Sequence, residues 1–189
     1  MSTEGSGEGL ARVTFPKGVS LKLEGRRLTA RGPLGTVVRT FPAAALELRT
    51  EGTEAILALR IPANRKRARS LLRTWAAHLA NLAGGLTNGV EARMKVVAAH
   101  FPMKVQARES QLVIENFLGE KHPRSALLVP GVQAKVDGDF VVLTGHDIEE
   151  VGQTSANIER ATRIRDYDPR VFQDGIYVIE RAHVREAPP

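Results

Sequence analysis

Hydrophobic and polar residues alternate along a short segment in the first half of the chain. In Val19–Leu23 every second position is apolar, which is the period of a half-buried strand, and Leu28–Ala30 returns after a turn. In the second half, Val105–Arg108 is expected to pair with Leu112–Glu115 around a turn at Glu109-Ser110. We therefore expect an antiparallel strand pair in each half.

The two strand pairs belong to a longer internal repeat. Val19–Gly35 aligns with Met103–Gly119 at an offset of 84 positions. Each copy is followed by a second strand pair, Leu46–Leu59 in the first half and Val132–Leu143 in the second half, and then by a helical segment. Self-similarity over most of a chain indicates two copies of one supersecondary unit.

The helical segments are predicted from apolar residues at spacings of three and four. Residues 65–83 form the first helix, and Gly84-Gly85 is expected to end it. The second helix covers residues 155–164, and Thr154 or Ser155 is expected to cap its N-terminus. The first helix carries one apolar stripe, made of Leu71, Leu72, Trp75, Leu79, Leu82 and Leu86.

These elements predict an α+β fold with two tandem duplicated domains, each an antiparallel β-sheet packed against one α-helix. Each half of the 189 residues can bury a modest core of its own. The boundary is expected near Gly89, because Asn88-Gly89 is a turn signal. The predicted division is a disordered tail at 1–11, an N-terminal repeat at 12–89, a C-terminal repeat at 90–183 and a tail at 184–189.

The charge of the chain is positive and unevenly distributed. Its 27 Lys/Arg and 21 Asp/Glu residues give a net charge of +6, with +8 up to Gly89 and −2 beyond it. A basic chain usually has an anionic partner, most often a nucleic acid, although the same charge can serve solubility alone. In the first helix, Arg65, Lys66, Arg69 and Arg73 crowd the N-terminal turns, where positive charge opposes the helix dipole. A bound anion and a solvated face are equally good explanations.

Several functional classes find little support in the residues. The absence of cysteine excludes disulfides and thiolate metal sites, and no apolar run reaches the ~18 residues of a membrane span. The N-terminal sequence MSTEGSGEG lacks the basic and apolar regions of a signal peptide. The five histidines show neither an HxxxH pair nor zinc-site spacing, and no phosphate-binding loop is present, so we predict no cofactor or metal site.

One acidic cluster leaves a catalytic interpretation open. His146-Asp147 and Glu149-Glu150 lie close together in the sequence and could form a metal or acid–base site. A solvated loop is the simpler interpretation of the same residues.

Three strings stand out along the chain: AHFP at Ala99–Pro102, NFLGEK at Asn116–Lys121 and FQDGIYV at Phe172–Val178. They resemble the archaeal and eukaryotic branch of large-subunit ribosomal protein L6. GPLG at Gly32–Gly35 and NRK at Asn64–Lys66 fit the same family, and the resemblance covers about residues 12 to 182.

The resemblance implies a two-domain, non-enzymatic structural protein of the large ribosomal subunit in the cytoplasm. It implies binding to large-subunit rRNA near the sarcin-ricin loop, mostly through the second domain, and contacts with neighbouring ribosomal proteins at the stalk base. Two alternatives are an RNA- or DNA-binding regulator acting off the ribosome and a small enzyme that uses the region of Asp147.

The residues expected to contact rRNA are basic and lie mostly in the second half. Bases gather at Lys121–Arg124 and Arg160–Arg170 while acids gather elsewhere, which predicts a two-faced domain. The predicted contacts are Lys121 and Arg124 in the loop after the NFLG hairpin, Arg160 and Arg163 on the second helix, Arg170 before the C-terminal segment, and Lys95 and His100 at the entry to the domain.

The C-terminal segment is expected to add an edge strand at Ile176 and Val178. Tyr177 between them could stack on a base, but core packing is the more common role of such a residue. Gly119 and Gly175 are interpreted as positions that allow close backbone approach or positive φ.

Overall fold

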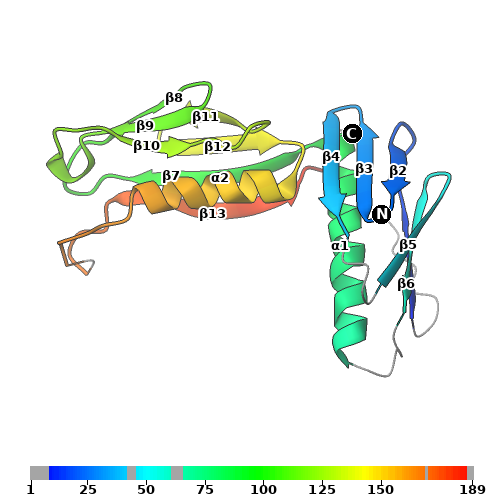
Figure 1. Cartoon of the computed structure of the whole chain (residues 1–189). Helices are drawn as coiled ribbons and strands as arrows, with labels where there is room; N and C mark the ends of the chain where they lie inside the picture. Colours follow the sequence, from blue (N-terminus) through cyan, green and yellow to red (C-terminus); the bar gives the residue numbers. More distant parts are fainter. Residues whose placement is uncertain (1–8, 42–45, 61–65, 169, 187–189) are drawn as a thin grey trace. The chain divides into compact units, whose positions relative to one another are not determined.

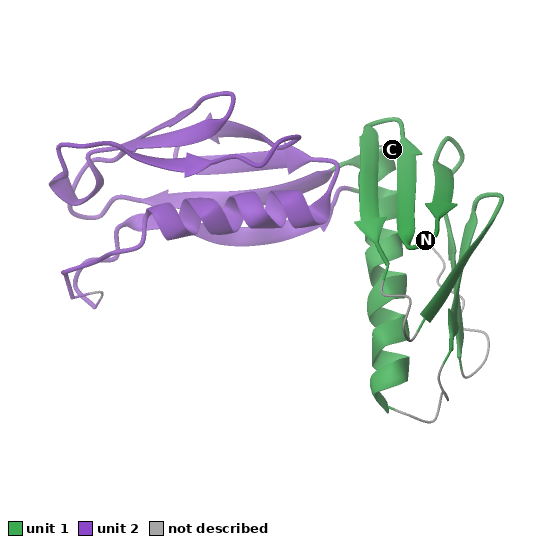
Figure 2. Cartoon of the chain, in the orientation of Figure 1, with its two compact units in different colours: residues 1–89, 186–189 green, residues 90–185 purple. Residues whose placement is uncertain are grey.

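The structure is a computed structural model that describes residues 9–41, 46–60, 66–168 and 170–186. The chain forms two compact units. Unit 1 consists of residues 1–89 and 186–189, and unit 2 consists of residues 90–185 (Figure 2). Residues 1–8 of the predicted N-terminal tail and residues 187–189 of the predicted C-terminal tail lie outside the described part of the chain.

The described residues of unit 1 form two three-stranded antiparallel sheets and one helix (Figure 1). The predicted strand pairs are confirmed, with turns at Gly25 and Gly52, where φ is positive. In order across each sheet, the strands are β2 (Ser20–Glu24), β3 (Arg27–Gly32) and β4 (Gly35–Thr40), and β1 (Leu10–Thr14), β6 (Glu54–Leu59) and β5 (Leu46–Glu51).

The helix of unit 1, α1 (Lys66–Asn88), buries the predicted apolar stripe against the sheets. Leu72, Leu79, Leu82 and Leu86 are buried, and Leu71 and Trp75 pack at the edge of the same core. Trp75 meets the ring of Phe41 edge-on at 4.9 Å between centroids, which confirms its core role. Asn64 and Arg65, predicted to open this helix, lie outside the described residues.

The prediction that Gly84-Gly85 ends this helix is wrong. Both glycines are buried inside α1, which continues to Asn88. The β3–β4 turn packs against this last part of the helix, because the Leu34 backbone N–H donates to the Leu86 carbonyl oxygen at 3.2 Å. Tertiary packing therefore overrides the weak helix propensity of glycine, and the chain leaves the helix only at Gly89, where φ is 81°.

Unit 2 has the same arrangement with one strand added. Its three-stranded sheet is β8 (Lys104–Ala107), β9 (Gln111–Glu115) and β10 (Arg124–Leu127), and a short 3-10 turn, η1 (Phe117–Gly119), follows β9. The four-stranded sheet is β11 (Gln133–Asp137), β12 (Phe140–Gly145), β7 (Val90–Val97) and β13 (Gly175–Val184), with α2 (Ile148–Ala161) packed against it.

The strand order confirms the duplicated α+β fold. The order β1-β6-β5 in unit 1 corresponds to β7-β12-β11 in unit 2, and β2-β3-β4 corresponds to β8-β9-β10. The predicted edge strand around Ile176 is confirmed as β13, which pairs with β7 only. In the described residues, each unit contains two sheets rather than one, and β4 and β10 each add a third strand to a predicted pair.

The predicted bounds of the second helix are wrong. Helix α2 begins at Ile148, where the carboxylate of Asp147 accepts a hydrogen bond from the Glu149 backbone N–H at 2.9 Å. Thr154 and Ser155, the predicted caps, lie buried inside the helix, and their hydroxyls donate to carbonyl oxygens one turn earlier. These internal hydrogen bonds satisfy hydroxyls that otherwise favour a helix terminus.

Candidate nucleic-acid interface

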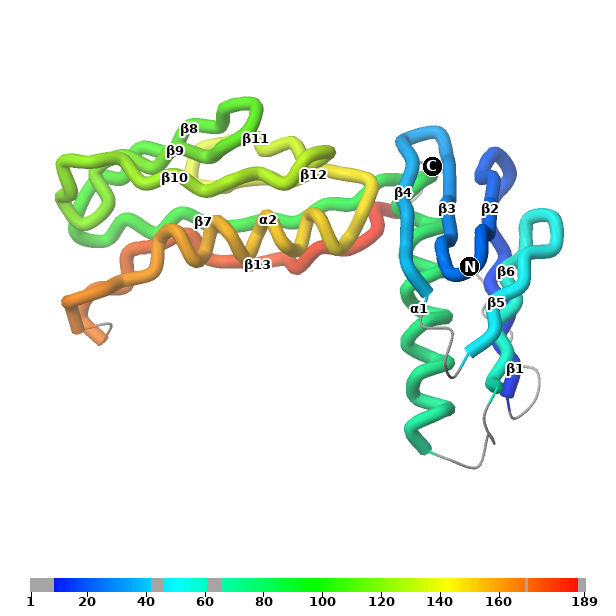
Figure 3. The backbone as a smooth tube through the Cα atoms, in the orientation of Figure 1, coloured from blue at the N-terminus to red at the C-terminus, as the bar shows by residue number. Residues whose placement is uncertain are grey.

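Three loops meet at the end of unit 2 where α2 terminates (Figure 3). They are the β7–β8 loop (98–103), the segment from β9 to β10 that contains η1 (116–123), and the connection from α2 to β13 (162–174). We call this region the loop end. The strings AHFP and NFLGEK lie in the first two loops, and FQDGIYV begins in the third, so the fold gathers these family motifs in one place.

Direct contacts join the first two loops. The side-chain amide of Asn116 donates to the Pro102 carbonyl oxygen at 2.9 Å. Gly119 has a φ of 78°, and a Cβ atom there would lie 3.2 Å from the ring of Phe101. The positional role predicted for Gly119 is therefore confirmed by both its backbone conformation and its packing.

His100 and Asp174 join the first and third loops. Asp174 accepts a hydrogen bond from the His100 backbone N–H at 3.0 Å and approaches Nδ1 of its ring at 2.7 Å. Burial raises the pKa of this carboxyl, but hydrogen bonds from the backbone and ring of His100 and from the Phe101 N–H outweigh it, so that the pKa is lowered overall. An ionised carboxylate only accepts, so Nδ1 carries the proton in this pair.

Arg124 is held by partners within unit 2. The prediction that it lies in a loop is wrong, because it begins β10. Its Nε and Nη2 donate to the Glu120 carboxylate, and Nη1 donates to the carbonyl oxygens of Ala161 and Arg163 at 2.9 and 3.0 Å. The guanidinium also lies 4.2 Å from the centre of the Phe117 ring. Arg124 therefore ties β10 to the C-terminal end of α2, where cations are favourable.

The other predicted arginines remain exposed at the same end. Arg160 lies in the last turn of α2, as expected, but Arg163 follows the helix rather than lying on it, and Arg165 comes after Arg163. These three side chains line a hollow of about 380 Å³ together with Arg124 and Ser125. Sequence reasoning omitted Arg165 from the site, although it belongs to the same basic run.

Lys121 and Arg170 complete the cations of the loop end. Both residues are exposed, Lys121 in the loop that precedes β10 and Arg170 in the loop that precedes β13. Within the described part of the chain, no ion pair engages Lys121, Arg170 or the three exposed arginines of the hollow. The predicted set thus contains exposed cations that can meet phosphates.

Lys95 does not belong to the hollow. It lies on β7, in register with Phe140 of β12 and Tyr177 of β13, on the exposed face of the four-stranded sheet. Tyr177 is 43% exposed, and it is absent from the core of unit 2. The prediction that Tyr177 packs in the core is therefore wrong.

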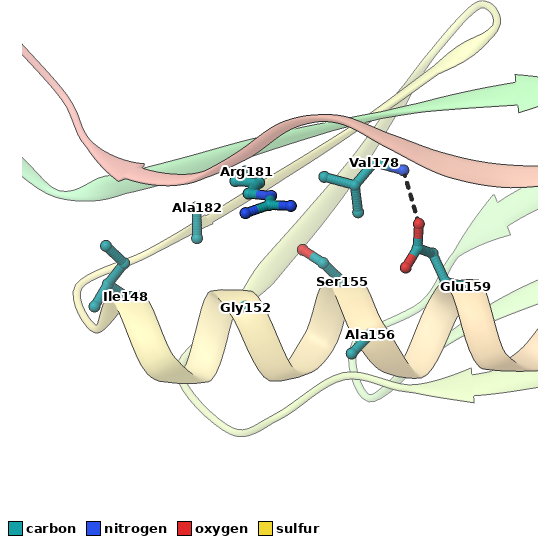
Figure 4. Close-up of a pocket in the computed structure, with 8 residues that line it drawn as sticks. All are labelled: Ile148, Gly152, Ser155, Ala156, Glu159, Val178, Arg181 and Ala182. Carbon is teal, nitrogen blue, oxygen red and sulfur yellow. Dashed lines mark hydrogen bonds between the residues drawn. The ribbon is translucent and has the colours of Figure 1, made fainter.

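A second hollow lies between α2 and β13 (Figure 4). Glu159 reaches across it and accepts a hydrogen bond from the Val178 backbone N–H at 3.1 Å, and Arg181 projects over the helix. Because the Glu159 carboxylate occupies the Val178 backbone N–H, this part of the free edge of β13 is not open to pairing with another strand. This hollow combines small apolar side chains with one acid and one base, and it lacks the cluster of cations seen at the loop end.

The acidic cluster around Asp147 has a structural role in α2. Asp147 is buried at 3% exposure and caps α2, so the interpretation of this cluster as a solvated loop is wrong for Asp147. Among the described residues, no three His, Asp or Glu side chains are placed to hold a metal ion, and no helix is both long and apolar enough to cross a membrane.

In unit 1, a basic hollow lies on α1. It is lined by Lys66, Arg69 and Arg73 together with Ser70.

Comparisons with known proteins agree with the motifs. The family model described as ribosomal protein L6 matches residues 101–175. The protein named large ribosomal subunit protein uL6 from Methanosarcina mazei is 45% identical over 172 residues, which cover 90% of this chain and 96% of that protein. Proteins of the same name from Methanospirillum hungatei and Ignicoccus hospitalis are 46% and 45% identical, each over 90% of this chain and over 96% and 94% of their own lengths.

Proposed function

Because this chain belongs to the ribosomal protein L6 family, we propose that it binds large-subunit rRNA through the loop end of unit 2. The chain is a protein of the large ribosomal subunit, and its role there is structural rather than catalytic. The observation that carries the proposed site is the group of exposed cations around three loops, of which the first is hydrogen-bonded to each of the other two. These cations are Lys121, Arg160, Arg163, Arg165 and Arg170.

The geometry of the loop end suits a phosphate backbone. Lysine and arginine neutralise phosphates and release counterions, which gives affinity with little sequence information. Folded RNA is then recognised through its shape and its 2′-hydroxyls. Arg124 fixes the base of the hollow through its bonds to Glu120 and to the end of α2, so the exposed arginines project from a rigid support.

We further propose the position that the family resemblance implies. Unit 2 contacts rRNA near the sarcin-ricin loop, and the chain supports the region where translation factors bind. Unit 1 then contacts neighbouring proteins or RNA at the stalk base, and the basic hollow formed by Lys66, Arg69 and Arg73 is its best candidate surface.

A salt series tests the rRNA site. The full chain is titrated with large-subunit rRNA, and the triple variant Arg160→Ala, Arg163→Ala, Arg165→Ala is compared with a control that removes Arg12, Arg27 and Arg31 of unit 1. Each lost phosphate contact lowers the slope of log affinity against log salt by about 0.7 to 0.9. We expect a slope lower by about 2 in the unit 2 variant and little change in the control. Equal slopes in all three proteins would refute the site.

Sedimentation tests the ribosomal assignment against the alternative of a regulator acting off the ribosome. A structural protein of the large subunit is expected to remain with that subunit through a high-salt wash. A regulator held mainly by surface charge is expected to be released, because salt weakens exposed electrostatic contacts.

A further inference from the structure

The four-stranded sheet of unit 2 has one covered face and one open face. Met94, Val141 and Ile176 lie on the covered face and are fully or almost fully buried. Their neighbours along the strands, Lys95 on β7 and Tyr177 on β13, point to the opposite face and are exposed. Alternation along a strand therefore places a cation and an aromatic ring together on the open face.

Strand register places three side chains of this face in one row. Phe140 of β12 pairs with Lys95 of β7, and Lys95 pairs with Tyr177 of β13. Side chains directly opposite each other on neighbouring strands have Cβ atoms about 5 Å apart. The Arg93 guanidinium lies 5.2 Å from the centre of the Phe140 ring and 3.4 Å from Glu180. Arg93 therefore occupies the neighbourhood of Phe140 and leaves Tyr177 as the accessible ring of the row.

Tyr177 is exposed but fixed in position. Its hydroxyl donates to the Gln173 carbonyl oxygen at 3.1 Å. Its ring lies against Gly175, where a Cβ atom would come within 3.0 Å of the ring carbon Cζ. The predicted close approach at Gly175 is thus confirmed, and its reason is the ring of Tyr177. Because the hydroxyl hydrogen is already bonded to Gln173, Tyr177 is available to a ligand through the face of its ring rather than as a hydrogen-bond donor.

We propose that an unpaired base of the bound RNA stacks on the exposed face of Tyr177 while Lys95 contacts the adjoining phosphate. This inference rests on the proposed function and adds the kind of RNA element that is recognised. A rigid aromatic ring beside a cation is the arrangement by which proteins hold unstacked bases of RNA. The site adjoins the loop end, because Gln173 and Asp174 hold both Tyr177 and the β7–β8 loop.

Substitutions at Tyr177 test this stacking site in the full chain with large-subunit rRNA. Stacking of one base typically contributes about 1–3 kcal/mol, so Tyr177→Leu is expected to weaken binding about 5- to 150-fold. The salt slope should not change, because stacking neutralises no phosphate. Tyr177→Phe keeps the ring and should retain most of the affinity. Lys95→Ala should instead lower the salt slope by about 0.7 to 0.9.

Two further variants separate stacking from general damage to the fold. Ile179→Ala removes another exposed apolar side chain of β13, 48% exposed, and should bind as the wild type does. Gly175→Ala keeps Tyr177 but forces its ring to move, so it should weaken binding in the same direction as Tyr177→Leu. Circular dichroism of each variant confirms that the fold is retained.

The outcomes distinguish this inference from the proposed function. If Tyr177→Leu binds rRNA as tightly as the wild type while the triple arginine variant does not, the stacking site is wrong and the rRNA site stands. If Tyr177→Leu leaves rRNA affinity unchanged but releases the chain from the large subunit, the ring contacts a protein and the inference is overturned. If the wild type does not bind rRNA, both proposals fail together.

Discussion

Among the single residues, Arg124 is a cation whose side-chain hydrogen bonds are made to other residues of unit 2. It bonds to Glu120 and to two carbonyl oxygens at the end of α2, and its side chain is only 23% exposed. The guanidinium lowers the pKa of Glu120 through their hydrogen bonds. Sequence alone grouped Arg124 with the exposed arginines because residue type does not reveal a partner 37 positions away.

We expect Arg124→Ala to destabilise unit 2 by about 1–3 kcal/mol, because the Glu120 carboxylate and the last carbonyls of α2 lose a charged partner. Urea denaturation measures the free energy of unfolding. Arg163→Ala removes an exposed arginine from the same end and should change stability by less than about 0.5 kcal/mol. Equal stability of the two variants would show that the bonds of Arg124 contribute little.

Asp174 gives unit 2 a pH dependence with a definite sign. Its native pKa lies below the unfolded value of about 3.9. The stabilisation is therefore present above that pH and is lost as the pH falls through the native pKa. We expect Asp174→Asn to lower the free energy of unfolding at neutral pH, and the difference from the wild type should shrink as the pH falls below the unfolded pKa. A difference that stays constant with pH would contradict this assignment.

At the level of the elements, the two helices differ in whether the charged residues in their terminal turns are favourable for the helix dipole. Helix α2 has Glu149 and Glu150 in its first turn and Arg160 in its last turn, which is the favourable arrangement. Helix α1 has no acid in its first turn and no base in its last turn, and it begins with Lys66 and Arg67. Positive charge at this end costs stability in the free protein.

Charge reversal at the start of α1 should therefore stabilise unit 1. Each of Lys66→Glu and Arg67→Glu is expected to raise the free energy of unfolding by about 0.3–1 kcal/mol at low salt. Arg73→Glu makes the same charge change two turns into the helix and should have a smaller effect, since the dipole acts mainly on the first turn. Thermal denaturation at low and high salt measures the gain, which screening should reduce. A loss of stability in the first two variants would contradict the prediction.

At the scale of the whole molecule, the two units have separate hydrophobic cores. The core of unit 1 includes Leu79 and Leu86, and the core of unit 2 includes Leu143 and Ile158. We propose that the predicted repeats are independent folding domains, because each core is built from strands and a helix of its own unit.

A cavity in one core should then affect one unit only. Ile158 is completely buried, so Ile158→Ala is expected to cost about 2–5 kcal/mol. Hydrogen exchange should accelerate in residues 90–185 and stay unchanged in the amides of unit 1. Leu79→Ala should give the reverse pattern. Faster exchange in both units after either substitution would show that they unfold together.

The candidate site was predictable only in part. Sequence placed Lys121, Arg160, Arg163 and Arg170 among the cations of unit 2, and these residues are exposed at the loop end. The sequence does not reveal that Arg124, unlike these residues, is held by partners within unit 2. It also does not place Lys95 on the open face of the sheet, because that position depends on strand register. Whether these residues bind rRNA remains a prediction.

The repeated unit, the strand pairs, the apolar stripe of α1 and the family are all encoded in local sequence. These features follow from local periodicity, turn glycines and motif residues. Three features depend on the folded chain: Gly84 and Gly85 stay inside α1, α2 begins at Ile148, and Tyr177 is fixed on an open face. Packing and hydrogen bonds with more distant parts of the fold set these three outcomes, and local sequence preference does not encode such contacts.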